Sequence, residues 1–176
     1  MACPVCQSPS TDGVPLSNGT VVHVHCLKGL TGSLSTSERA VSVRRTRVAR
    51  MRAMLARWNT TIGRIERFLG RIADLEDLES RIAAAETALL AAESAQNDAE
   101  SLLLEIYDHM LEYPPDWAAR SAAVRKRYVV CSECGSDSML QAHHVVPLSK
   151  GGTNRLANLT WECTRFDGHL VKSILS

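Results

Sequence analysis

The middle of the chain carries a long, regular pattern of apolar residues. Residues 37–113 contain no proline, and their apolar positions recur at alternating intervals of three and four. This spacing puts them on one face of a helix and is typical of a coiled coil. The first rows are Val41, Val48, Leu55, Ile62 and Leu69, with Met51, Trp58, Ile65 and Ile72. After Ile72 the phase slips by one residue and then resumes to Met110. We expect long helices that start at a cap, Thr36 or Ser37, and end before Pro114.

The charges of this region change sign where the phase slips. Residues 39–71 include ten arginines and a single acid, whereas residues 74–112 include eleven acids and a single base. Two halves of opposite charge and nearly equal length favour antiparallel pairing. The pairing can close within one chain as a hairpin, or between two chains in a homodimer, and the sequence leaves both open. In a further alternative, the arginines bind the phosphates of DNA.

The first residues of the chain predict a small metal site. Residues 1–35 are rich in Gly, Ser, Thr and Pro, so they cannot bury a core of their own. They contain Cys3-x2-Cys6 and, sixteen residues later, His23-x2-Cys26. Two pairs of ligands at this spacing are typical of a structural zinc site. The predicted ligands are Cys3, Cys6, His23 and Cys26, with His25 as the alternative to His23.

The remaining composition limits the protein class. The chain has six cysteines in two groups of three, each opening with C-x2-C, which predicts metal binding rather than disulfides in a reducing compartment. No apolar run is long enough for a transmembrane helix, and the N-terminus has no basic and apolar leader. The formal net charge of +1 indicates no partner by itself. We therefore expect a cytoplasmic protein with no membrane partner.

The sequence from Tyr128 onward resembles the HNH, or ββα-metal, nucleases. The shared features, in order, are Cys131-x2-Cys134, His143-His144 followed by Val145-Val146-Pro147, the Gly151-Gly152 turn, Asn158-Leu159, Cys163 and His169-x2-Lys172. They extend over about a quarter of the chain. Local propensities agree with two strands and a helix: Val145-Val146 ends one strand, a second lies near Leu159, and a helix follows from Gly168 to Ile174.

The resemblance implies a metal-dependent endonuclease that nicks or cuts DNA, of a kind found in phages and in bacterial defence. His144 would be the general base. His143 and His169 would bind a catalytic divalent ion, for which Mg, Mn, Ni and Zn are candidates. Asn158 would hold the loop and help orient the base, and Lys172 would contact the phosphate.

The chain departs from the family pattern after Cys163. In the family a second C-x2-C usually follows, with the histidine directly after it, whereas here two residues are inserted and the fourth cysteine is absent. A structural zinc would be held by Cys131, Cys134 and Cys163, with Asp167 as a candidate fourth ligand, or the site is degenerate and empty. The alternative function is therefore a non-catalytic, zinc-stapled DNA-binding or adaptor protein with a degenerate HNH fold.

Together these patterns predict a mainly α-helical protein of four segments. Residues 1–35 form the zinc-binding segment, and residues 36–113 form an antiparallel coiled-coil stalk. Residues 114–127 form a hinge and a short basic helix capped by Asp116. Residues 128–176 form the HNH module, so DNA is the expected partner.

Overall fold

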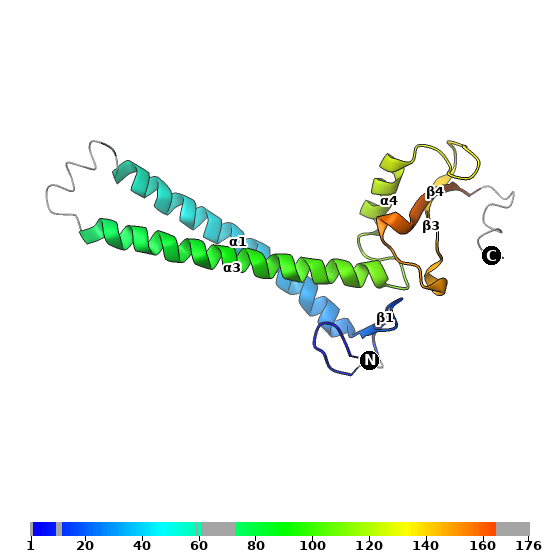
Figure 1. The fold of residues 1–176 in the computed structure, drawn as a ribbon, viewed down its shortest axis with the longest axis horizontal. Coiled ribbons are helices and arrows are strands. Elements are labelled where there is room, and N and C mark those ends of the chain that lie inside the picture. The colour runs from blue at the N-terminus through cyan, green and yellow to red at the C-terminus, as the bar shows by residue number, and fades with distance from the viewer. Residues whose placement is uncertain (1, 10–11, 59, 61–72, 165–176) are drawn as a thin grey trace. The chain divides into compact units, whose positions relative to one another are not determined.

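The structure is a computed structural model that describes residues 2–9, 12–58, 60 and 73–164, and these are mainly helical, as expected (Figure 1). The elements are β1 (Val14–Pro15), β2 (Val21–Val22), α1 (Val24–Trp58), α3 (Ala73–His109), α4 (Trp117–Arg127), β3 (Leu140–His144) and β4 (Leu159–Cys163), with short 3₁₀ helices at Leu148–Lys150 and Leu156–Asn158. The chain divides into two compact units, Met1–Lys28 with Leu102–Ser176, and Gly29–Ser101. The four-segment division stays a prediction.

In the unit Gly29–Ser101, α1 and α3 pair in antiparallel directions within one chain. Their shared core consists of residues from the predicted apolar rows: Val48, Met51, Leu78 and Ile82, with Leu55, Ala85 and Leu89 packed against them. Arg45 contacts Glu93 and Arg52 contacts Glu86, each at 2.7 Å. Arg52 lies seven residues after Arg45, whereas its partner Glu86 lies seven residues before Glu93. This is the register of antiparallel helices. The expected antiparallel helix pair is confirmed.

The predicted start of the first long helix is wrong. α1 begins at Val24 rather than at Thr36 or Ser37. Both hydroxyls lie inside the helix and donate to carbonyls of the preceding turn, Thr36 Oγ1 to Ser33 at 2.8 Å and Ser37 Oγ to Leu34 at 2.8 Å. A hydroxyl that can cap a helix can equally bond back to the helix backbone. The residue type alone therefore did not locate the start.

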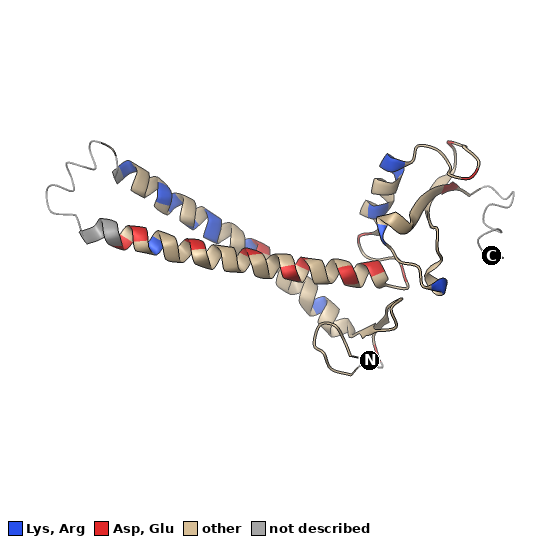
Figure 2. Ribbon diagram, in the orientation of Figure 1, with Lys and Arg blue, Asp and Glu red and all other residues tan. Residues whose placement is uncertain are grey.

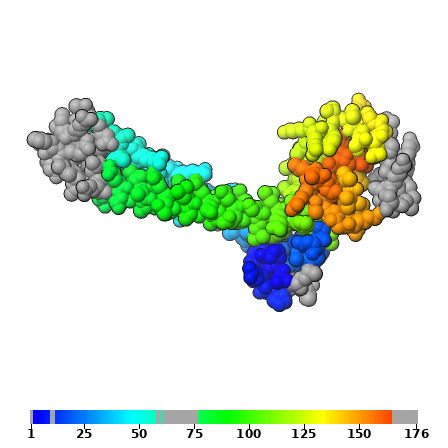
Figure 3. Space-filling view, in the orientation of Figure 1, coloured from blue at the N-terminus to red at the C-terminus, as the bar shows by residue number. Residues whose placement is uncertain are grey.

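The second long helix ends at His109 rather than at residue 113. The next residue, Met110, forms an isolated antiparallel bridge with Leu16. The amide of Ser17 donates to the carbonyl of His109 at 2.6 Å, and the Ser17 hydroxyl lies 2.9 Å from the His109 ring. The N-terminal segment, blue in Figure 3, thus lies against the end of α3. Strand-like pairing replaces helical pairing at this point, which explains the earlier end.

The short basic helix α4 has the predicted range, but Asp116 does not cap it as expected. Asp116 occupies the N-cap position without making a cap hydrogen bond. Its carboxylate instead accepts from Arg120 Nε at 2.9 Å. Arg120 is buried, and it also donates to the carboxylate of Asp108 and, at 2.8 Å, to the carbonyl of Asn154. This contact set ties α4 to the end of α3 and to the loop before β4.

β3 and β4 form an antiparallel hairpin, with Leu140 opposite Cys163 and His144 opposite Leu159. The helix expected from Gly168 to Ile174 lies outside the described residues, as does the apolar row between residues 61 and 72. No helix within the described part of the chain is long and apolar enough to cross a membrane.

Candidate functional site

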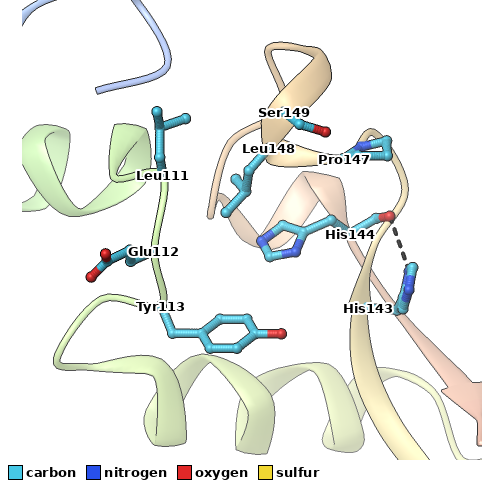
Figure 4. A pocket seen from close by; sticks show the side chains of 8 residues that line it. All are labelled: Leu111, Glu112, Tyr113, His143, His144, Pro147, Leu148 and Ser149. Carbon is cyan, nitrogen blue, oxygen red and sulfur yellow. Dashed lines mark hydrogen bonds between the residues drawn. The ribbon is translucent and has the colours of Figure 1, made fainter. Parts of the chain in front are cut away.

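Two adjacent histidines lie beside a pocket at the end of β3. His143 and His144 are the last residues of this strand, so the alternation of a strand directs them to opposite faces. The pocket has a volume of about 700 Å³ and is lined by Leu111, Glu112, Tyr113, His143, His144, Pro147, Leu148 and Ser149. In Figure 4 the ring of His144 points into this pocket, and His143 lies at its edge. The two rings therefore meet different surroundings.

The ring of His144 is held in one tautomer by Asn154. His144 Nε2 lies 2.9 Å from Asn154 Oδ1. Asn154 is fully buried, and its Nδ2 donates to the carbonyls of Tyr107, Met110 and Glu112 at 3.1, 2.8 and 3.3 Å. Because the amide nitrogen faces these acceptors, the amide oxygen faces the imidazole, so Nε2 carries the hydrogen. The lone pair of His144 is left on Nδ1.

Two aromatic rings help to bury His144. The ring centroids of Trp117 and Tyr113 lie 5.4 and 6.2 Å from that of His144, with interplanar angles of 23° and 11°. Burial lowers the pKa of His144, the hydrogen bond that its Nε2 donates to Asn154 opposes this, and the neighbouring His143 lowers the pKa further. A lowered pKa keeps the imidazole neutral at pH 7, which is the form that accepts a proton.

His143 presents its other ring nitrogen. Its Nδ1 lies 3.1 Å from the carbonyl of His144, the dashed line of Figure 4. A carbonyl only accepts, so Nδ1 carries the hydrogen and the lone pair is on Nε2. Glu162 Oε2 lies 3.9 Å from the same Nδ1. Histidines that bind metals commonly have this support from a carbonyl or carboxylate on the second nitrogen. Thus His143 fits a metal ligand, whereas His169 and Lys172 lie outside the described residues.

Asn158 fastens the loop that follows β3. Its Oδ1 accepts from the amide of Val146 at 2.9 Å, and its Nδ2 donates to the carbonyls of Val146 and Thr153 at 3.0 and 2.8 Å. Its backbone carbonyl accepts from the amide of Val145 at 2.9 Å. A side-chain amide thus takes the place of a strand partner for Val146. This is why β3 ends at His144, two residues before the expected end.

The double glycine is required by the same loop. Gly151 has a φ of 84°, in the left-handed region that favours glycine. A Cβ on Gly152 would overlap the carbonyl of Val146, and the amide of Gly152 donates to the carbonyl of Pro147 at 3.0 Å. The loop therefore folds tightly onto its own start, which brings Leu148 to the pocket (Figure 4).

The first cysteine group places four donors together. The ligand atoms of Cys3, Cys6, His23 and Cys26 all lie within 4.8 Å of one another. His23 Nδ1 is 3.4 Å from Cys6 Sγ and 3.8 Å from Cys26 Sγ. Zinc bond lengths and a tetrahedral angle give about 3.6 Å for such an edge, so the donors fit a zinc ion. The competing residue His25 has its Nε2 3.3 Å from Cys26 Sγ but lies outside the four-donor group.

The second cysteine group has three donors. The sulfurs of Cys131, Cys134 and Cys163 lie within 4.8 Å of one another, and those of Cys134 and Cys163 are 3.5 Å apart. The edge between two sulfurs around tetrahedral zinc is about 3.8 Å. No fourth histidine, cysteine or carboxylate joins them within the part of the chain that the structure describes. Asp167, the expected fourth ligand, lies outside that part. The three thiols fit three of the four ligand positions around a zinc ion.

Backbone amides favour the thiolate form of the first cysteine in each group. Burial by itself raises the pKa of Cys3, but hydrogen bonds from the amides of Cys6, His23 and Val5 lower it to about 6. The pKa of Cys131 is lowered to about 7 by a similar balance, in which amide hydrogen bonds outweigh burial. The thiolate is the form that binds metals.

Asn154, Tyr113, Trp117 and Glu162 were not predicted as site residues. Asn154 follows Gly-Gly-Thr and looks like any turn residue, while Tyr113 and Trp117 flank a double proline that reads as a hinge. Their roles come from contacts with residues distant in the sequence. Only a signal for contact, such as covariation with the end of α3, could have found Asn154.

A comparison with protein families assigns part of the chain. Residues 131–165 match the family model described as HNH endonuclease. The match begins at the first cysteine of the three-donor group and includes the histidine pair, Asn154 and Asn158. Neither a curated protein nor a solved structure matches the chain.

Proposed function

We propose, from the premise that the C-terminal module of this chain belongs to the HNH endonuclease family, that the protein hydrolyses DNA phosphodiester bonds with a divalent metal ion. One observation carries the proposal. The two adjacent histidines have opposite tautomers, so His144 offers Nδ1 and His143 offers Nε2. A neutral base beside a metal ligand is the pair of groups that hydrolysis of a phosphodiester requires.

In this proposal His144 Nδ1 accepts the proton of the attacking water. The charge that then develops on the imidazole is shared through Nε2–H with Asn154 Oδ1. Asn154 is a positioning residue, because it fixes the tautomer and touches no reacting atom. Asn158 keeps the loop after β3 in place, and Lys172 contacts the phosphate.

The catalytic ion would be held by His143 Nε2 and by His169. When bound, a divalent ion supplies positive charge that stabilises the phosphate and the leaving oxygen in the transition state. The four-donor group of Cys3, Cys6, His23 and Cys26 is proposed to hold a structural zinc. The three-thiol group is proposed to hold a second zinc, with Asp167 as its fourth ligand.

The test is cleavage of a supercoiled plasmid by the full chain, titrated with magnesium, manganese and nickel. Replacing His144 with alanine (His144→Ala) should lower the cleavage rate by about 10²–10⁴-fold, because a positioned base is lost. DNA binding should stay nearly unchanged, since the base acts on water. His143→Ala should instead raise the metal concentration needed for half-maximal cleavage. EDTA should stop cleavage by the wild type.

A histidine outside the site provides the matched control. His25→Ala should cut at the wild-type rate, because His25 is exposed and lies in another part of the chain. If His144→Ala cuts as fast as His25→Ala, His144 is not the base and the proposed mechanism is wrong.

The second candidate function is a non-catalytic DNA-binding or adaptor protein. Two features of the sequence favour it: the fourth cysteine of the family pattern is absent, and two residues are inserted before His169. Wild-type protein that binds the plasmid but leaves it intact with every metal would replace the nuclease proposal with this one.

A further inference from the structure

The arginines of α1 fall into two sets with different surroundings. The helix carries seven arginines. Three of them reach α3: Arg45 and Arg52 pair with glutamates, and Arg44 donates to the carbonyl of Ala88 at 3.1 Å. The other four are exposed and make no hydrogen bond or ion pair with a described residue: Arg39, Arg47, Arg50 and Arg57. Pairing with α3 therefore accounts for less than half of the positive charge on α1.

The four remaining arginines share one side of the helix, which we name the arginine face. With about 100° per residue, they lie within an arc of about 80° that points away from the core residues Val48 and Leu55. Arg39 and Arg57 are five turns apart, about 27 Å along the axis. Between them only Val43 and Met54 add large apolar side chains, with 68% and 52% of their surface exposed. Figure 2 shows the basic residues along α1 in blue and the acidic residues of α3 in red.

We infer that the arginine face binds the phosphate backbone of duplex DNA. The inference rests on the proposed function only for the choice of DNA as the polyanion. A row of guanidinium groups along about five turns matches a ligand with regularly repeated negative charge. Arginine suits phosphate because its planar group donates two parallel hydrogen bonds.

Binding to a second copy of the chain is less well supported. Two of the glutamates on α3, Glu86 and Glu93, are already engaged by Arg52 and Arg45 of the same chain. A two-fold dimer formed through this face would bring the face against itself and place arginines opposite arginines. Such like charges repel, whereas DNA phosphates attract them.

The test measures the affinity of the full, zinc-loaded chain for a labelled DNA duplex by fluorescence anisotropy, without added magnesium, manganese or nickel and over a range of salt concentrations. Arg47→Gln/Arg50→Gln removes two charges from the arginine face. Arg45→Gln/Arg52→Gln removes the same charge from the same helix at the side that contacts α3. Binding is measured without the ion needed for cleavage, so the result does not depend on the proposed chemistry.

The face variant should reduce the slope of log affinity against log salt by about 1.8, since each phosphate contact contributes about 0.9. Relative to 1 M salt, this corresponds to roughly sixty-fold weaker binding at 0.1 M salt. The matched control should keep the wild-type slope. Equal slopes for wild type and face variant, equal losses in both variants, or a wild type that does not bind duplex would each overturn the inference. An altered molecular mass by light scattering with unchanged DNA binding would assign the face to a second copy instead.

These outcomes separate the inference from the proposed function. A wild type that never cuts DNA, together with a face variant that loses affinity, refutes the nuclease and leaves the arginine face standing. A wild type that cuts, together with a face variant that binds normally, supports the nuclease and refutes the arginine face.

Discussion

The two cysteine groups begin with the same backbone turn but contain different numbers of donors among the described residues. In the first, the amide of Cys3 donates to the carbonyl of Ser8 at 2.9 Å, and in the second, the amide of Cys131 donates to the carbonyl of Ser136 at 2.7 Å. The turn thus closes five residues after the first cysteine in both. Each turn therefore supplies two thiols to its group, Cys3 and Cys6 in the first and Cys131 and Cys134 in the second.

The number of further donors in each group depends on the later segment of the chain that lies beside the turn. In the first group the chain returns through His23 and Cys26 at the start of α1, which adds two donors. In the second it returns through Cys163 at the end of β4, which adds one donor among the described residues. A strand of alternating side chains offers neighbouring residues to opposite faces, whereas the first turn of a helix brings residues three apart to the same side. Among the described residues, the helical return therefore supplies one more donor than the strand return.

The largest expected effect is the loss of the four-donor group. Cys3→Ser combined with Cys6→Ser should remove about one zinc per chain and unfold the N-terminal segment, because structural zinc contributes about 10–16 kcal/mol in small zinc domains. Elemental analysis and limited proteolysis measure the two effects. Unchanged zinc content would mean that these cysteines do not form a metal site.

The fourth donor of that group can be tested with two neighbouring histidines. His23→Ala should lose the same zinc, whereas His25→Ala should keep it, since only His23 lies within the four-donor group. If only His25→Ala lost the zinc, His25 rather than His23 would be the fourth ligand.

A smaller effect should separate the two groups in wild-type protein. During titration with a chelator, the three-thiol group should release its metal at a chelator concentration about tenfold lower, because its proposed fourth ligand is a carboxylate rather than an imidazole, and about 1.4 kcal/mol of weaker ligand binding is tenfold in affinity. A colorimetric zinc indicator follows the release, and Cys131→Ser should remove the early phase alone. A single phase, or a late phase lost in Cys131→Ser, would contradict the difference between the groups.

The smallest effect concerns the shared turn. Its fifth residue has positive φ in both groups, 58° at Gln7 and 71° at Gly135. Gly135→Ala should cost about 1–2 kcal/mol, because a Cβ disfavours this conformation, while nothing lies within 4 Å of the added atom to oppose it otherwise. Gln7→Gly should cost nothing or stabilise the turn. Thermal unfolding of the zinc-loaded variants measures both effects. If the two substitutions shifted the unfolding temperature equally and in the same direction, the two turns would not share this conformational requirement.

The elements that could be predicted are those with a local signal. The apolar rows predicted the helix pair and its core, because the helical period is present in the sequence itself. The cysteine spacings likewise predicted two groups of converging thiols. The start of α1 could not be predicted in this way, since Gly29 and Gly32 in its first turns favour a loop.

The parts of the site that could not be predicted depend on contacts distant in sequence. The histidine pair and Asn158 belong to a family pattern, so their expected roles could be written down beforehand, and they remain proposals. The burial of Asn154 depends on the end of α3, more than forty residues earlier in the chain. Arg120 is buried because it meets two carboxylates and a loop carbonyl, which no local pattern encodes.

The three hydrogen bonds that Asn154 donates to the end of α3 and to the residues just after it also determine the smallest fragment that can keep this site. The residues that match the family begin at Cys131, but the carbonyls that hold Asn154 belong to residues 107–112. A fragment beginning at Tyr128 would contain both histidines and leave the Asn154 amide nitrogen without these acceptors. The side-chain amide of Asn154 would then be free to rotate by about 180°, so its oxygen would no longer fix the tautomer of His144. A fragment that keeps the site intact therefore has to include the last turn of α3, well before Cys131, where the family match begins.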